Sequence, residues 1–481
     1  MKEVIIIGAG FGGLCMAIKL RQAGIDDFTI LERNDHIGGT WYDNTYPGAA
    51  CDVESHLYSY SFEPNPNWSR QFSPQQEILQ YMDHCVSKYH LAPHILYKSK
   101  VTSTVFNEQQ GSWTITTADH KTYQAKIVIS CSGGLSEPAY PHIKGIENFK
   151  GKLFHTARWD KTFDLTDKRV AVIGTGASAI QVVPAIAPIV QNLFLFQRTP
   201  PWILPKPDKV ISDFRHQLYS RLPFIGKLYR LRLYWTHELM AIGFVVKPAV
   251  MKWIEKFALS YLHRKVKDEE LRIKLTPDYV IGCKRILLSK NYYPALQRAN
   301  VEVVTTGIEA ITETGVSIGT QNYAVDAIVL ATGFKAAEGV SMEVKGIGGI
   351  DLNYEWRDGA AAYLGTSVAG FPNLYLVVGP NTGLGHSSML LMIEAQVGYI
   401  IAALEAMQST RAKYLSVKRN IQEAYNEKLQ QDLSNTVWQS GGCRSWYQTA
   451  TGKNVALWSG FTFSFMRRLK RFDIRNYEVV G

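Results

Sequence analysis

The chain of 481 residues is too long for one ordinary hydrophobic core and suits two or three domains. Its hydrophobic fraction of 46% and charged fraction of 20% are typical of a globular protein and exclude a disordered or collagen-like one. The net charge of +10 fits an anionic ligand, nucleic acid, an anionic membrane surface or simple solubility, and composition selects none of these.

The cysteines and the first residues bear on the compartment. Six cysteines are spread along the chain without a CxxC pair, which argues against a disulfide scaffold or a zinc site and favours a reducing compartment. The N-terminal MKEVIIIGAG has a short apolar run that enters a glycine motif without a small-residue cleavage site. We interpret the run as a strand rather than a signal peptide, and we expect a cytoplasmic protein.

The first predicted unit is a βαβ motif. An opening strand runs into GAGFGG, a helix follows, and a second strand, FTILER, ends at Glu32. Gly8, Gly10 and Gly13 have the GxGxxG spacing, in which the glycines allow a tight turn, close approach of a pyrophosphate and close helix–strand packing. Glu32 stands where an acid accepts hydrogen bonds from a ribose, so the sequence predicts FAD or NAD here.

A second βαβ unit begins at Arg169 with RVAVIGTGASAIQ, which carries Gly174, Gly176 and Ala179 at the same spacing. Its second strand, NLFLFQRTP, ends in Gln197 and Arg198 instead of an acid. A guanidinium can pair bidentately with a ribose 2′-phosphate that a carboxylate would repel. The second loop therefore predicts NADP(H).

Residues 205–275 are expected to form a helical insertion. Within it, residues 224–262 are rich in apolar and basic side chains but are interrupted by Lys247 and Pro248. A spanning helix needs about 20 predominantly apolar residues in succession, so no span is predicted. Helices packed as a lid over a pocket are the leading interpretation, and weak contact with a membrane surface is the alternative.

A third strand-like segment, YAVDAIVLATGF at 323–334, is similar to YQAKIVISCSGG at 123–134. The two segments flank the second βαβ unit, which predicts an NADP domain (150–320) inserted into a discontinuous FAD domain (1–145 and 325–481). The second crossing between the domains is expected near residues 305–325. The predicted fold class is α/β with two Rossmann-like domains.

Two further motifs carry a resemblance. FKGKLFHTARWD fits F-x-G-x-x-x-H-x-x-x-W-[PD] at Phe149, Gly151, His155, Trp159 and Asp160. GGTWYDNTYPGAACD, at 38–52, fits a second pattern that ends in an Asp. With both dinucleotide loops, the chain resembles the class B flavoprotein monooxygenases, and the first motif resembles the signature of their Baeyer-Villiger members. Ala50 departs from several ketone-oxidising members, which carry Arg beside the Asp.

The resemblance implies a reaction. NADPH reduces FAD, the reduced flavin captures O2 as a C4a-peroxide, and the anionic peroxide attacks a ketone to give an ester or lactone, with sulfoxidation as a further activity. The alternative is an N- or S-oxygenating member of the same family. A disulfide reductase would need a redox cysteine pair near the flavin, and none is visible. Neither a metal nor a nucleic-acid partner is expected.

The resemblance also implies site residues. Arg285 matches the family's fixed cation, which stabilises negative oxygen and cannot release a proton. Asp52 would orient it through a carboxylate–guanidinium pair. The cofactor-binding residues implied by the loops and the resemblance are Gly8, Gly10, Phe11, Gly13, Glu32, Thr40, Trp41, Asp52, Tyr58, Val101, Gly174, Gly176, Ser178, Ala179, Arg198, Thr199, Lys284 and Trp446.

Two histidines invite a functional interpretation. His155 suits acid–base chemistry by type, but its motif lies at the first crossing between the predicted domains. We therefore expect a structural or hinge role for it. His386 follows GPNTGLG and is expected to open a helix whose N-terminus faces the flavin, without a catalytic role.

Overall fold

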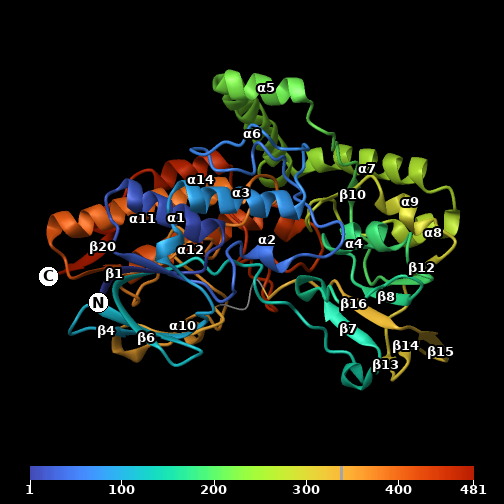
Figure 1. The fold of residues 1–481 in the computed structure, drawn as a ribbon, viewed down its shortest axis with the longest axis horizontal. Helices are drawn as coiled ribbons and strands as arrows, with labels where there is room; N and C mark the ends of the chain where they lie inside the picture. Colours follow the sequence, from blue (N-terminus) through green and yellow to red (C-terminus); the bar gives the residue numbers. More distant parts are fainter. Residues whose placement is uncertain (336–339) are drawn as a thin grey trace.

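The computed structural model describes residues 1–335 and 340–481, and two separate sheets organise it (Figure 1). The first sheet has the order β17-β4-β5-β6-β1-β2-β3, with β18 also paired to β6. Its strands are β1 (Lys2–Ile7), β2 (Phe28–Leu31), β3 (Ile95–Leu96), β4 (Val101–Asn107), β5 (Ser112–Thr117), β6 (Thr122–Ser130), β17 (Glu343–Lys345) and β18 (Leu374–Leu376).

The first sheet is parallel where it carries the first glycine loop. β1 pairs in parallel with both β2 and β6, and all four residues of β2 are buried, as expected for strands covered on both faces. Three helices share one hydrophobic core with this region: α1 (Phe11–Gln22), α3 (Gln75–Lys88) and α11 (Met389–Thr410). α11 is long and apolar enough to cross a membrane, but 56% of its apolar window is buried inside the protein, as in a core helix.

The second sheet has the order β12-β9-β8-β16-β7 and is parallel throughout. Its strands are β7 (Lys152–His155), β8 (Arg169–Ile173), β9 (Asn192–Phe196), β12 (Val301–Val304) and β16 (Ala327–Leu330). α4 (Ala179–Ile186) and α9 (Tyr292–Leu296) pack on it through a second core. A three-stranded antiparallel sheet lies beside it, made of β13 (Ala310–Ile311), β14 (Gly315–Ile318) and β15 (Gln321–Ala324).

One expectation about the crossing is wrong. β16, inside YAVDAIVLATGF, pairs with β7 and β8 of the second sheet, so this strand does not belong to the first sheet, and the chain returns to the first sheet after it rather than near 305–325. A buried strand that ends in small residues has the same sequence pattern in either sheet. Only the pairing partners distinguish the two.

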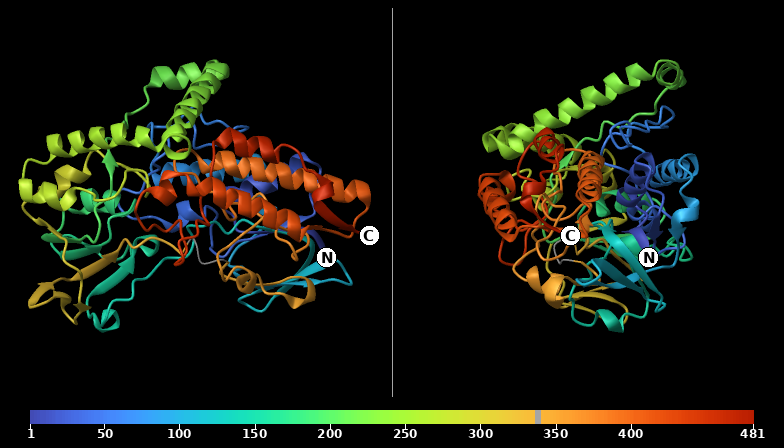
Figure 2. Two further views of the ribbon diagram at one scale, coloured as in Figure 1. Left: turned by 180° about the vertical axis from the view of Figure 1, so that it is seen from behind. Right: turned by 90° about the vertical axis from the view of Figure 1, so that its left-hand side faces the viewer.

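Four helices occupy the stretch where an insertion is predicted: α5 (Asp213–Arg221), α6 (Pro223–Val245), α7 (Met251–Lys265) and α8 (Glu269–Leu275). α6 rises away from the rest of the protein with α5 at its far end, and the right-hand view of Figure 2 shows the same projection from the side. We call α5 and α6 together the arm.

The C-terminal part returns to the first unit. α12 (Arg419–Ser434), α13 (Val437–Ser440) and α14 (Thr462–Leu469) pack in a third core, which also contains residues of α11 and of the arm. β19 (Tyr414–Val417) pairs with β20 (Tyr477–Val480). Shorter elements include α2 (Thr40–Asp43), α10 (Leu352–Glu355), β10 (Ile203–Leu204) and β11 (Leu287–Leu288).

Candidate active site

The first glycine loop has the geometry of a dinucleotide cradle. Gly8 has φ +99°, and a Cβ on Gly13 would lie 1.9 Å from the Gly8 carbonyl oxygen, so both positions need glycine for the turn and for the helix–strand contact. A Cβ on Gly10 would meet only the Cα of Gly39, at 3.8 Å. The protein itself leaves room at Gly10, which fits the close approach of a pyrophosphate.

Glu32 closes this loop. Its Oε2 accepts a hydrogen bond from the backbone N–H of Ala9 at 2.7 Å, and its Oε1 accepts one from Asn34 N–H at 2.9 Å. Burial raises the pKa of the Glu32 carboxyl, and the two N–H groups oppose that effect. Each carboxylate oxygen has further lone pairs, so these bonds leave Glu32 able to accept from a ribose hydroxyl.

The aromatic residues named for FAD lie together. Trp41, in α2, donates its indole N–H to the Tyr58 hydroxyl at 3.0 Å, and the Phe11 ring meets the Tyr58 ring edge-on at 5.5 Å. Thr40 opens α2 and remains partly exposed. Val101, at the start of β4, is buried in the core between the sheet and the segment after β17.

The second glycine loop has the spacing of the first, except that Ala179 stands where the first loop has Gly13. Gly174 has φ +110°, and a Cβ there would lie 2.4 Å from the Ala331 carbonyl oxygen, whereas a Cβ on Gly176 would meet nothing within 4 Å. Ser178 precedes α4 and Ala179 begins it, fully buried. The loop is thus open at Gly176, as the first is at Gly10.

Two cations flank the second loop. Arg198 is exposed and forms neither a hydrogen bond nor an ion pair among the residues that the structure describes, while Thr199 accepts a hydrogen bond from Thr175 at 2.9 Å through its carbonyl. The Lys284 ammonium lies 4.7 Å from the centre of the Tyr279 ring. Burial lowers the pKa of Lys284, and the nearby charge of Arg198 adds to that effect. Two cations of this kind, close enough for their charges to interact, suit a phosphate.

Arg285 and Asp52 form a close pair, although 233 positions separate them. The Arg285 Nε and Nη2 atoms each lie 2.8 Å from Asp52 Oδ2, and both side chains remain 30% exposed. The charge of Asp52 raises the pKa of Arg285. Burial alone would raise the pKa of Asp52, but the charge and hydrogen bonds of Arg285 outweigh it and lower that pKa. Both groups are therefore ionised at neutral pH.

The loop that ends at Asp52 bridges the two units. Tyr46 donates a hydrogen bond at 2.9 Å to the side chain of Gln181 in α4, and Gln181 donates to the Ala50 carbonyl at 2.9 Å. Lys206 donates to the Cys51 carbonyl at 2.9 Å. The second motif of the sequence thus fixes the position of Asp52 relative to the second glycine loop.

A disulfide joins Cys283 to Cys443, across 160 positions of sequence. This single bridge was not predicted from the sequence, and the other four cysteines are buried and free, so the chain has no disulfide scaffold. Trp446, half exposed, contacts Tyr447 with ring centres 4.5 Å apart. Cys283 immediately precedes Lys284 and Arg285, so the bridge holds the segment of Trp446 beside the cations. Spacing alone gave no signal for it.

His155 ends β7 and is fully buried. Its Nδ1 accepts a hydrogen bond from the Ala157 N–H at 3.0 Å, and its ring lies against Phe334. Burial lowers its pKa to about 4, so the ring is neutral at neutral pH. Trp159 packs edge-on against Phe154, and Asp160 pairs with Lys152 at 2.8 Å. The motif therefore braces the edge of the second sheet.

One contact close to the Arg285–Asp52 pair was not predicted from the sequence. His237 of α6 faces Glu54 through Nε2, at 2.7 Å, and donates through Nδ1 to the His386 carbonyl. Burial opposes charge on the ring, but the hydrogen bond and charge of Glu54 outweigh it and raise the pKa of His237. Glu54 follows Asp52 by two positions. α11 begins at Met389, after a cap by Ser388, so His386 precedes the helix rather than opening it.

Comparisons with known proteins place this site in a family. Residues 5–211 match the family described as pyridine nucleotide-disulphide oxidoreductase. A Baeyer-Villiger monooxygenase of Pseudomonas aeruginosa is 50% identical over 480 residues, which cover 99% of this chain and 91% of that protein. The chain belongs to the Baeyer-Villiger monooxygenases. It is accordingly an FAD-containing, NADPH-dependent monooxygenase that inserts oxygen beside a carbonyl, as the motifs predicted.

Solved structures agree with this membership. Cyclohexanone monooxygenase from Rhodococcus sp. Phi1, bound to NADP+, has a TM-score of 0.90 at 27% identity and covers 100% of this chain and 99% of its own. The crystal structure of an OTEMO complex with FAD and NADP has a TM-score of 0.90 at 26% identity, with the same coverage. The α/β fold with two dinucleotide-binding units is therefore confirmed.

Proposed function

We propose that this Baeyer-Villiger monooxygenase acts on a small-molecule ketone, with Arg285 as the fixed positive charge at the reacting oxygen and Asp52 as the residue that orients it. The Arg285–Asp52 pair carries the proposal, because it unites residues from both units and remains partly exposed. Bound FAD supplies the redox chemistry that takes electrons from NADPH and transfers oxygen from O2 to the substrate.

The hydrogen bonds of Arg285 support this role. Its Nε and Nη2 are directed at Asp52, while Nη1 lies 3.4 Å from the Leu384 carbonyl oxygen. A guanidinium has five N–H groups, so donors remain for an oxygen that becomes negative during the reaction. Because Arg285 keeps its proton at any working pH, it stabilises that oxygen without protonating it.

The nucleotides follow from the loops. We assign FAD to the loop of Gly8, Gly10 and Gly13 with Glu32, and the NADP(H) 2′-phosphate to Arg198 and Lys284. The second unit interrupts the first in this proposal, with crossings between β6 and β7 and after β16. A cytoplasmic location belongs to the same proposal, and cell fractionation checks it.

The test uses the purified FAD-loaded enzyme with NADPH and O2, and offers a ketone and a thioether separately while flavin absorbance is followed. We expect an ester or lactone from the ketone, with NADPH consumption coupled to product. A sulfoxide without ester, together with activity that survives Arg285→Ala, would favour the N- or S-oxygenating alternative and overturn the assignment of Arg285.

A further inference from the structure

The arm exposes a row of apolar side chains to solvent. On α6, Phe224, Leu228, Leu231, Trp235 and Leu239 are all exposed, by 50% to 66%. Their spacing of four, three, four and four places them on one stripe of the helix. The face of α6 that includes His237, Ala241 and Phe244 is buried against the protein. A helix that buries one face and still shows an apolar stripe outward calls for a contact partner.

The stripe reaches α14, and α7 carries further exposed aromatic residues. The Trp235 ring lies 6.5 Å from that of Phe463 in α14, whose Met466 is also exposed. On α7, Trp253 and Phe257 are exposed by 76% and 52% and lie one helical turn apart. We call the stripe of α6 with these residues of α7 and α14 the outer face. It exceeds the scattered single apolar residues of an ordinary surface.

Basic side chains accompany the outer face. Between residues 221 and 265 the acids are Glu238, which is buried, and Glu255. Residues 462–471 contain no acid. The Lys256 ammonium lies 5.5 Å from the centre of the Trp253 ring. The exposed basic residues of these two stretches are Arg221, Lys227, Arg232, Lys247, Lys252, Lys256, Arg264, Lys265, Arg467, Arg468, Lys470 and Arg471.

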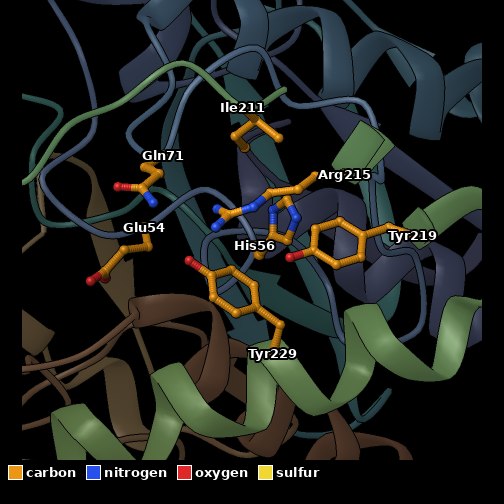
Figure 3. Close-up of a pocket in the computed structure, with 7 residues that line it drawn as sticks. All are labelled: Glu54, His56, Gln71, Ile211, Arg215, Tyr219 and Tyr229. Atoms are coloured by element: carbon orange, nitrogen blue, oxygen red, sulfur yellow. The ribbon is translucent and has the colours of Figure 1, made fainter. Parts of the chain in front are cut away.

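The arm is fixed to the protein rather than loosely attached. Arg230 donates hydrogen bonds from α6 to the carbonyls of His56 and Leu57, at 2.7 and 3.2 Å. Figure 3 shows where α5 and the first turns of α6 meet the protein: the His56 ring lies beside Tyr219 and Tyr229, and these residues line a small pocket. The centre of the His56 ring lies 5.0 Å from that of Tyr219 and 5.4 Å from that of Tyr229. The outer face is therefore held in one orientation.

We propose that the outer face docks on the surface of an anionic lipid bilayer. Apolar side chains with Trp on one side and Lys and Arg around them are the pattern of a helix that lies in the membrane interface. Anionic headgroups match the excess of basic residues. A second copy of the chain fits less well, because a two-fold contact through this face would bring like charges together. The docking does not depend on the proposed roles of Arg285 and Asp52.

Vesicle binding tests the proposal on the FAD-loaded enzyme. We expect sedimentation with vesicles that contain phosphatidylglycerol, weak sedimentation with phosphatidylcholine alone, and a blue shift of tryptophan fluorescence on binding. The double change Leu231→Ser with Trp235→Ser should weaken binding by tenfold or more, since two apolar side chains that would leave water on docking are replaced by polar ones. Lys227→Glu with Arg232→Glu should weaken it by about tenfold or more and reduce its salt dependence.

The matched control is Tyr354→Ser, because Tyr354 lies outside the outer face, on α10, and is 63% exposed. It should bind vesicles as the wild type does. Equal binding to both kinds of vesicle, equal loss in the control, or a dimer that light scattering shows to dissociate in the Leu231→Ser and Trp235→Ser variant would overturn the proposal. An enzyme that binds vesicles but makes no ester would leave the docking intact and refute the proposed function instead.

Discussion

The two glycine loops have one topology but close differently at the strand that follows. In the first unit Glu32 accepts the Ala9 N–H and thereby ties the strand end to its own loop. In the second unit the residue after β9, Gln197, instead donates at 2.6 Å to the Lys274 carbonyl in α8. Arg198 is left exposed beside the open loop. The first loop is thus built around an acid that suits a ribose, and the second around a cation that suits its phosphate.

The third small residue of each loop gives the largest expected difference. Gly13→Ala places a Cβ 1.9 Å from the Gly8 carbonyl oxygen. We therefore expect the free energy of unfolding to fall by more than about 4 kcal/mol and little FAD-loaded protein to form. Ala179→Gly, at the matching position, should lower the free energy of unfolding by only about 1 kcal/mol. Flavin content per protein and thermal unfolding measure both. Similar behaviour of the two variants would show that the loops do not differ in packing.

The strand-end residues give the next effect. Arg198→Ala removes a charge-assisted contact with the 2′-phosphate, so the KM for NADPH should rise about tenfold to a hundredfold. The KM for NADH, which lacks that phosphate, should change little. Steady-state kinetics with both nucleotides give the comparison, and Arg198→Lys should retain part of the preference. An equal loss with NADPH and NADH would contradict the assignment of Arg198.

The two open positions separate ligand binding from folding. Gly10→Ala and Gly176→Ala meet no protein atom closer than 3.8 Å, so both variants should unfold near the wild-type temperature. Each should weaken only its own nucleotide, by about tenfold or more, because the methyl group would occupy space needed by a pyrophosphate. Flavin retention reports on Gly10 and NADPH titration on Gly176. Loss of both nucleotides in one variant would mean that the loops are not independent sites.

Asp52 and Glu32 should respond to pH in opposite directions. The pKa of Asp52 is lowered in the fold, so its contribution to stability is present above the ordinary aspartate pKa of about 4 and is lost as pH falls through the lowered value. The pKa of Glu32 is raised, so its ionisation lowers stability as pH rises through the raised value. In denaturant titrations, Asp52→Asn should therefore destabilise the protein most at neutral pH and less in acid. A constant difference would contradict the pairing with Arg285.

The sequence alone predicted the local motifs of this fold, but it did not predict which distant segments pack together. Both glycine loops, their helices and the strand ends at Glu32 and Arg198 are contiguous motifs, so their geometry follows from short stretches of chain. The resemblance brought Asp52 and Arg285 together before any contact was visible. The placement of β16 failed because a strand pattern does not name its partners.

The spacing of residues in the sequence did not predict two of the contacts. Cys283 and Cys443 lie far apart without a paired motif, and His237 meets Glu54 and the His386 carbonyl from three separate segments. Such contacts depend on how the arm and the C-terminal helices pack against the first unit. They are fixed by tertiary structure rather than by local pattern.

In the proposed function, Arg285, oriented by Asp52, directs oxygen to a ketone. The most direct measurement compares ester formed per NADPH consumed in the wild type, Arg285→Ala and Arg285→Lys, each loaded with FAD, with flavin reduction by NADPH as the control. We expect both variants to be reduced by NADPH and to lose ester formation by about a hundredfold or more, because a fixed charge at a developing oxyanion contributes about 3 kcal/mol. Ester formation at the wild-type yield in Arg285→Ala would contradict this role of Arg285.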